Sequence, residues 1–188
     1  MKKTFKQFLI ETPLPDDWDD AVFNPNVPFI KRVRYAKERA KRLGAGSSRV
    51  AFLTPYQGRN TVLKVAKNGK GIVQNEEELT LLEDWYLNKL GITIPLIDYD
   101  KNNDSPTWLH VEFATKAKER DFIKETGVDL HTLIKYCEHT SGRSRSGYGD
   151  FSKVNEESDF VQSIVDFIGN YTHVPTGDLT RLANWDIS

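Results

Sequence analysis

Apolar positions in the first half of the chain change from a helical to a strand-like spacing. Over residues 29–43 they recur every three or four residues, which predicts a helix, and Gly44 predicts its end. The apolar stretch 50–53 and the β-branched stretch 61–66 are separated by the turn-forming sequence Gln-Gly-Arg-Asn at 57–60. This pattern predicts a β-hairpin after the helix.

The following segment predicts one helix and two further strands. Residues 75–90 place apolar side chains on one face, and Asn75 with Glu78 forms a capping-box-like pair at the start of that helix. Strands are expected at 92–99 and 107–114, joined by a polar turn. A small antiparallel sheet with one packed helix is therefore predicted.

The two ends of the chain have other patterns. Residues 1–11 predict a short amphipathic helix, and a proline-rich linker without regular structure follows, up to residue 28. In the second half, apolar residues at helical spacing predict helices at 129–138 and 156–168. Strands around one helix, followed by helices, are typical of an α+β protein with segregated halves.

This order divides the chain into three parts. Residues 1–28 are a leader and linker, residues 29–115 an α+β region that opens with a basic helix, and residues 116–188 a helical C-terminal region. The total length suits one domain of ordinary size, or a small domain with a tail.

Composition limits the class of protein. Of the 188 residues, 38% are hydrophobic and 28% charged, which is enough for a core but unlike a membrane protein or a disordered chain. The single cysteine, Cys137, excludes a disulfide framework within the chain, and its place on an apolar helix face predicts a buried structural thiol. The N-terminus has no uninterrupted apolar run of a secretory signal, so we expect a soluble protein in a reducing compartment, without a membrane partner.

The formal net charge is −1, but basic side chains gather between residues 29 and 49. The basic cluster consists of Lys31, Arg32, Arg34, Lys37, Arg39, Lys41, Arg42 and Arg49. Such a cluster indicates contact with the phosphates of a nucleotide or a nucleic acid. A solvated helix face, packed against acidic segments of the same chain, is the alternative.

A glycine-containing loop is the first candidate site. Gly44 and Gly46 let the backbone turn tightly and approach a ligand, while Ser47, Ser48 and Arg49 supply donors that suit a phosphate. A helix-stop glycine followed by a turn explains the same residues without a ligand.

Lys64 is the second candidate. It lies in the middle of an apolar strand, where an ammonium group needs a carboxylate or a phosphate unless the position faces outward. Glu78 in the following helix is the natural partner. We predict that Lys64 and Glu78 meet within salt-bridge distance, with residues 44–49 folded above them.

In combination these residues resemble the N-lobe of protein kinases. The segments 43–50, 62–64, 78–82 and 111–113 follow the order of a kinase glycine-rich loop, strand lysine, helix glutamate and hinge strand. The start of a helix at 127–130 also resembles the segment after a kinase hinge. The resemblance implies a nucleotide site made of Gly44, Gly46, Ser47, Ser48, Arg49, Lys64, Glu78 and Glu112.

The sequence also departs from the kinase pattern. Arg49 precedes Val50 where a kinase has its third glycine, which makes the loop one residue short, and the basic helix takes the place of the first strand. Residues 176–184 loosely resemble a catalytic loop, with Asp178 as base and Asn184 as metal ligand. The preceding His-Arg pair and an Asp-Phe-Gly motif are absent, so the resemblance implies a binding scaffold more readily than a phosphotransferase.

A second resemblance concerns the leader. Residues 1–11 resemble the capsid-targeting leaders of internal head proteins of tailed bacteriophages, which are cut after a glutamate, and an ordinary amphipathic helix is the alternative. The segments 46–49 and 70–76 resemble kinase-like phage proteins.

These resemblances lead to one expected function and two alternatives. We expect a phage-encoded, non-catalytic kinase-like protein that binds a host or phage protein, in the host cytoplasm or packaged in the virion head; this role requires no cofactor. One alternative is an active small kinase or nucleotidyl-transfer enzyme that uses Lys64, Glu78, Asp178 and Asn184 with ATP and magnesium. The other is nucleic-acid binding through the basic cluster.

Overall fold

The computed structural model describes residues 13–15, 17–91, 93–115, 117–143 and 149–170. Its residues divide into two compact units. The first unit holds the described residues up to Asp84 together with Ile94–Phe113. The second unit holds Trp85–Thr93 and the described residues from Ala114 onward. The predicted leader helix lies outside the described residues.

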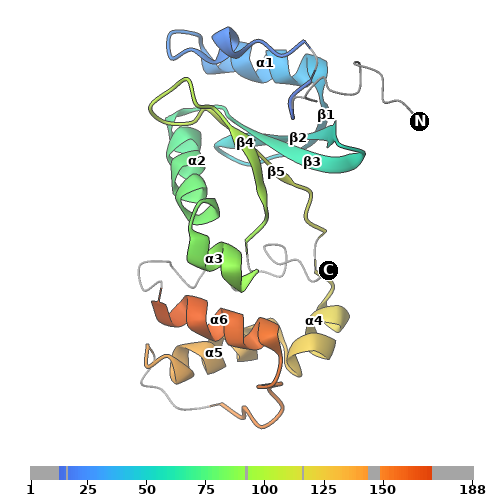
Figure 1. The fold of residues 1–188 in the computed structure, drawn as a ribbon, viewed down its shortest axis with the longest axis vertical. Helices are drawn as coiled ribbons and strands as arrows, with labels where there is room; N and C mark the ends of the chain where they lie inside the picture. Colours follow the sequence, from blue (N-terminus) through green and yellow to red (C-terminus); the bar gives the residue numbers. More distant parts are fainter. Residues whose placement is uncertain (1–12, 16, 92, 116, 144–148, 171–188) are drawn as a thin grey trace, which may run out of the picture. The chain divides into compact units, whose positions relative to one another are not determined.

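The first unit is an α+β structure built around one sheet (Figure 1). Its elements are η2 (Asp20–Phe23), α1 (Phe29–Arg39), β1 (Lys41–Ala45), β2 (Arg49–Tyr56), β3 (Arg59–Ala66), α2 (Gly69–Leu82), β4 (Leu96–Tyr99) and β5 (Trp108–Glu112). The second unit is helical, with α3 (Trp85–Leu90), α4 (Glu119–Thr126), α5 (Leu130–Thr140) and α6 (Asp159–Asn170). The predicted α+β class, with a small antiparallel sheet, a packed helix and a helical second half, is confirmed. No helix of the described residues is both long and apolar enough to cross a membrane.

The sheet has five antiparallel strands in the order β1-β2-β3-β5-β4. β2 and β3 form the predicted hairpin, and the turn residues Gln57 and Gly58 both have positive φ. Two such residues match the right-handed twist of the strands that they join. β4 and β5 confirm the other predicted strands within shorter limits.

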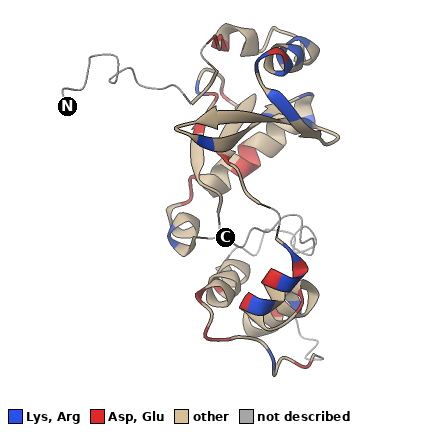
Figure 2. Cartoon of the chain, turned by 90° about the vertical axis from the view of Figure 1, so that its right-hand side faces the viewer, with Lys and Arg blue, Asp and Glu red and all other residues tan. Residues whose placement is uncertain are grey.

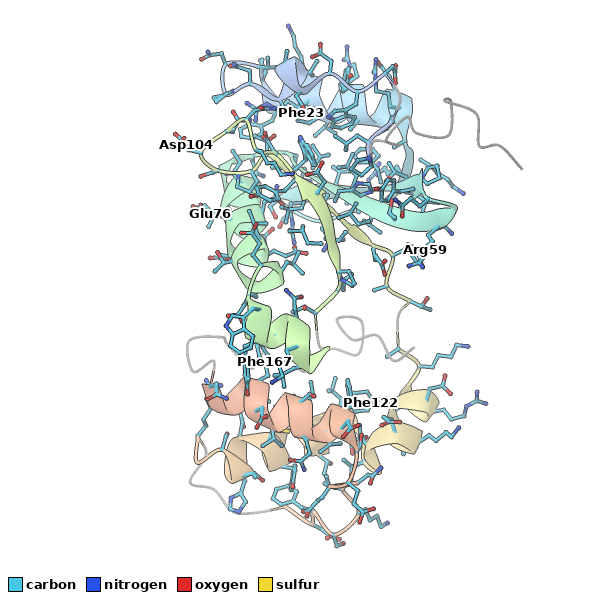
Figure 3. The ribbon with its side chains drawn as sticks, in the orientation of Figure 1. Phe23, Arg59, Glu76, Asp104, Phe122 and Phe167 are labelled. Carbon is cyan, nitrogen blue, oxygen red and sulfur yellow. The ribbon has the colours of Figure 1, made fainter. Side chains whose placement is uncertain are left out.

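The two faces of the sheet have different environments, because residues paired across neighbouring strands share a face. One face carries two rows of paired residues. The first row is Val50, Val65 and Trp108, and the second is Phe52 and Leu63. These side chains pack with Phe23 and with Ala36 of α1 in one core cluster, so we call this the core face (Figures 1 and 3). The opposite face carries Ala51, Lys64 and Leu109; we call it the Lys64 face.

Side chains of α1 hold the preceding linker against the first unit. Arg32 is buried and donates to the carbonyls of Val27 and Asn24, at 2.9 Å each. Arg39 forms an ion pair of 2.9 Å with Asp17. The linker also contains the short helix η2, whose first turn is capped by the carboxylate of Asp19. The prediction that the linker lacks regular structure was therefore wrong at η2.

The predicted helix over 29–43 ends earlier than its periodicity indicated. α1 ends at Arg39, and residues 41–45 form β1, in which Lys41 pairs with Leu53 and Arg42 with Phe52. Pairing with β2 satisfies the backbone of these residues and outweighs their helical spacing. The first strand is therefore present, and its predicted replacement by the basic helix was wrong.

The predicted helix over 75–90 is two helices. α2 begins at Gly69, where the side chain of Asn68 accepts a hydrogen bond from the amide of Gly71, and it ends at Leu82 before α3 starts. Asn75 lies buried inside α2 and donates to the carbonyl of Pro106 at 3.0 Å. The predicted capping box of Asn75 and Glu78 was therefore wrong.

The second unit has its own core. Phe122 of α4, Leu133 and Cys137 of α5 and Ile164 of α6 belong to one buried cluster. α5 and α6 confirm the two predicted helices, whereas α4 was not predicted. Cys137 is the predicted buried thiol, and burial raises its pKa to about 12.

A histidine is buried in the sheet beside two threonines. His110 Nε2 lies 2.9 Å from Oγ1 of Thr54 and 2.6 Å from Oγ1 of Thr61. Thr61 donates its own hydroxyl hydrogen to the carbonyl of Thr54, so the tautomer with a proton on Nε2 suits both threonine oxygens. Protonation would add a buried donor at Nδ1, for which the described residues supply no acceptor. Burial lowers the pKa of His110 to about 4, although Asp98 acts in the opposite direction.

We predict that His110 makes the protein acid-sensitive. Unfolded histidine has a pKa of about 6.5, so between pH 6.5 and 4 the unfolded chain binds more protons than the folded one. The free energy of unfolding should therefore fall by roughly 3 kcal/mol as pH drops through this window. Urea unfolding at a series of pH values should show this slope in the wild type and a flatter one in His110→Gln. The exposed His131→Gln is the control; equal slopes in wild type and His110→Gln would refute the prediction.

Candidate functional site

Lys64 and Glu78 form the ion pair that the sequence predicts. Lys64 lies on β3, and its Nζ donates to Oε1 of Glu78 on α2. The exposed fractions of the two side chains are 22% and 21%. α2 therefore lies against the Lys64 face, and the lysine points away from the core face.

Arg49 is a second cation on the same carboxylate. Its Nη1 lies 2.5 Å from Oε2 of Glu78 and 3.2 Å from Oδ1 of Asn75. Burial raises the pKa of Glu78, but the charges and hydrogen bonds of Lys64 and Arg49 outweigh it and lower the pKa. Glu78 thus stays ionised, with each oxygen bound to a different cation.

The connection between β1 and β2 is fixed against the start of α2. Ser48 Oγ donates to Gln74 Oε1 at 2.5 Å, and its carbonyl accepts from the amide of Lys67 at 2.9 Å. Asn68 Nδ2 donates to the carbonyl of Ser47 at 3.2 Å. A Cβ at Gly71 would lie 2.2 Å from the carbonyl oxygen of Ser48, so only glycine permits this close approach.

Gly44 and Gly46, unlike Gly71, have no close neighbour that requires glycine. Neither has a positive φ, and a Cβ added at either position would meet no atom within 4 Å. Gly44 pairs with Ala51 inside β1 rather than ending a helix. The packing of the described residues therefore does not require glycine at these two positions, and the space beside them is open.

The strand register corrects the comparison with the kinase loop. Ala51 pairs with Lys64, whereas Val50 pairs with Val65 on the core face and is buried. The kinase motif places its valine two residues after the third glycine. The prediction of a loop one residue short took Val50 as that valine, and in the register of β2 with β3 it is Ala51, two residues after Arg49, that lies opposite Lys64.

Apolar side chains continue the Lys64 face along the strands. Ala51, Leu53 and Val62 are half-buried, while Leu109 and Val111 are fully buried. Leu53 pairs with Val62, and Val62 pairs with Val111, so these residues form adjacent rows on one face. A partly exposed apolar strip therefore borders the charged cluster.

Other predicted site residues lie elsewhere. Glu112 pairs with Thr61 on the opposite face from Lys64, and its carboxylate lies 3.3 Å from Arg59. Its amide donates to the carbonyl of Pro95 at 3.0 Å. Asp178 and Asn184 lie outside the described residues.

The basic cluster divides into internal and exposed members. Arg32, Arg39 and Arg49 are held by the contacts given above. The exposed members are Lys31, Arg34, Lys37, Lys41 and Arg42, along α1 and β1 (Figure 2). The alternative of nucleic-acid binding through this cluster stays a prediction, with these exposed residues as its surface.

The sequence predicts Arg49 as a loop residue, whereas its contact with Glu78 is a finding of the structure. Alternation along the strand carried the missing signal, because residues 49, 51 and 53 fall on one face when the strand begins at Arg49. In the described part of the chain, no group of three or more His, Cys, Asp or Glu side chains could hold a metal ion.

Similarity to known proteins is found among solved structures. No family model matches the chain, and no curated protein matches it. Among solved structures, the chain is similar to a thermostable mutant of aminoglycoside phosphotransferase APH(4)-Ia in a ternary complex with AMP-PNP and hygromycin B. The identity is 18% and the TM-score 0.31, over 60% of this chain and 35% of that chain. None of the comparisons shows a relationship to phage proteins, and the function proposed below rests on the geometry of the chain itself.

We predict that Gly71→Ala disturbs the charged cluster through the β1–β2 connection. The added methyl group would collide with the carbonyl of Ser48, and overpacking of this kind costs roughly 1–3 kcal/mol. Thermal unfolding should show a lower melting temperature. Gly69→Ala, at a position with no atom within 4 Å, is the matched control and should melt like the wild type. Equal melting temperatures for both variants would contradict the contact with Ser48.

Proposed function

We propose that the Lys64 face binds a nucleoside triphosphate. The observation that carries the proposal is the ion pair of Lys64 and Glu78 between a central strand and the helix that follows it. In protein kinases a strand lysine contacts the nucleotide phosphates and a helix glutamate holds that lysine in place. The same two residue types meet here, on the face that the core leaves partly exposed.

The charge balance of the cluster supports an anionic ligand. Lys64 and Arg49 carry two positive charges, and Glu78, which both contact, carries one negative charge. Each of the three side chains is at least three-quarters buried. A partly buried excess of positive charge is costly for folding unless it is compensated. A phosphate group would supply that compensation.

The surroundings fit the two ends of a nucleotide. The half-buried side chains of Ala51, Leu53 and Val62 offer an apolar surface for a flat base, as in most small-molecule sites. At the other end, the open space beside Gly44 and Gly46 allows phosphates to approach the backbone. ATP is therefore the ligand that we propose to test.

We propose nucleotide binding alone, and the more specific predictions from the sequence stay predictions. A phage origin, a host or phage protein as partner, and a location in host cytoplasm or virion head stay predictions. The expected absence of catalysis also stays a prediction. So does the alternative of a small kinase that uses Asp178 and Asn184.

We predict that Lys64→Met abolishes most ATP binding. A hydrogen bond to a charged group contributes roughly 1.5–3 kcal/mol, so the affinity measured by isothermal titration calorimetry should fall by about tenfold or more. Glu78 keeps Arg49 as its partner in this variant, which limits the damage to the fold. Lys124→Met, an exposed lysine of α4, is the control. Wild-type affinity in Lys64→Met would rule out the proposed site.

We predict that Gly44→Ala and Gly46→Ala separate ligand binding from stability. No atom lies near the added methyl groups, so the free energy of unfolding should stay within about 0.5 kcal/mol of the wild type. ATP affinity should fall, because the methyl groups would occupy the approach of the phosphates.

Gly58→Ala is the opposite control for this pair. Gly58 has a φ of +75°, so alanine should cost about 1 kcal/mol of stability in the hairpin turn without changing ATP affinity. If Gly44→Ala and Gly46→Ala both bind ATP like the wild type, the phosphates do not approach this loop.

A further inference from the structure

Arg49 has more hydrogen-bonding capacity than its contacts use. A guanidinium carries five N–H donors, and only Nη1 of Arg49 has partners, Glu78 and Asn75, in the described part of the chain. The exposed fraction of the side chain is 25%, so part of it remains open to a ligand. The donors of Nε and Nη2 are therefore available beside Lys64.

The side chain of Arg49 is also held in a defined orientation. Its carboxylate partner is already bound by Lys64, so a second cation is not needed to neutralise Glu78. Asn75 orients the guanidinium and is itself fixed by its hydrogen bond to Pro106. An arginine held in this way is suited to bidentate contact with phosphate oxygens.

The described residues do not fit the magnesium ion that the kinase resemblance implies. Magnesium prefers carboxylate and water oxygens in a regular octahedron. The carboxylate of this cluster is Glu78, and both of its oxygens are bound to cations. Lys64 and Arg49 would repel a divalent ion placed among them. Asn184, the metal ligand that the resemblance implies, lies outside the described residues, and within the described ranges no cluster of three acidic, histidine or cysteine side chains is present.

We infer that Arg49 is a second phosphate-binding residue and that it allows a nucleoside triphosphate to bind without a divalent metal ion. The inference rests on the proposed function and specifies its ligand as the metal-free polyphosphate. After the negative charge of Glu78 is counted, Lys64 and Arg49 leave one net positive charge for the phosphates, and this charge takes over part of the neutralisation that magnesium supplies in a kinase. The ion pairs with Glu78 hold both cations in place before the ligand arrives.

The test is calorimetric titration of the full chain with ATP, once in buffer with EDTA and once with excess magnesium chloride. We expect wild-type affinities that agree within about threefold in the two buffers, since the cations replace the metal. Arg49→Met should lose about tenfold or more in EDTA, and Arg49→Lys should recover part of that loss. Arg120→Met removes an exposed arginine of α4, outside the basic cluster, and it should bind like the wild type.

The outcomes separate the inference from the proposed function. ATP binding by the wild type that requires magnesium would overturn the inference and leave nucleotide binding intact, as would full affinity of Arg49→Met in EDTA. A wild-type chain that binds ATP in neither buffer would overturn both. The comparison of the two buffers uses the wild-type chain alone. It therefore tests metal-free binding even if Arg49→Met does not fold.

Discussion

A single carboxylate, Glu78, connects the elements on which the candidate site depends. One of its oxygens binds Lys64 of β3 and the other binds Arg49 at the start of β2, so α2 is tied to two strands at once. Ser48 and Gly71 add a close contact between the same helix and the β1–β2 connection. Partly buried ion pairs contribute little net stability after desolvation. Their effect here is to fix where two cations point.

One face of the sheet packs in the core, and the other face carries the residues of the proposed binding site. The core face buries Phe52, Leu63 and Val65 under α1, and this packing stabilises the first unit. The Lys64 face keeps half-buried apolar residues and two cations with donors that point away from the core. Because alternation separates the two sets of side chains, the binding face can be polar without disturbing the core.

The sequence predicted the contact of Lys64 with Glu78 better than the boundaries of the elements. The hairpin and the contact of Lys64 with Glu78 follow from local alternation and from a helix after a strand, and both are confirmed. The end of α1 and the existence of β1 depend on pairing with β2, which no local pattern contains. The contact of Arg49 with Glu78 depends on the register that places Ala51, rather than Val50, opposite Lys64. The pairing of β1 and β3 with β2 therefore determines the end of α1 and the position of Arg49, which the periodicity of the sequence does not determine.

Covalent labelling with an acyl-phosphate analogue of ATP tests the central claim most directly. A lysine amine beside the bound phosphates attacks the acyl carbon, forms an amide and releases ATP, and mass spectrometry locates the modified residue. Binding at the Lys64 face predicts acylation of Lys64 that excess ATP suppresses. Labelling confined to exposed lysines such as Lys31 and Lys37, unaffected by ATP, would contradict nucleotide binding at this face.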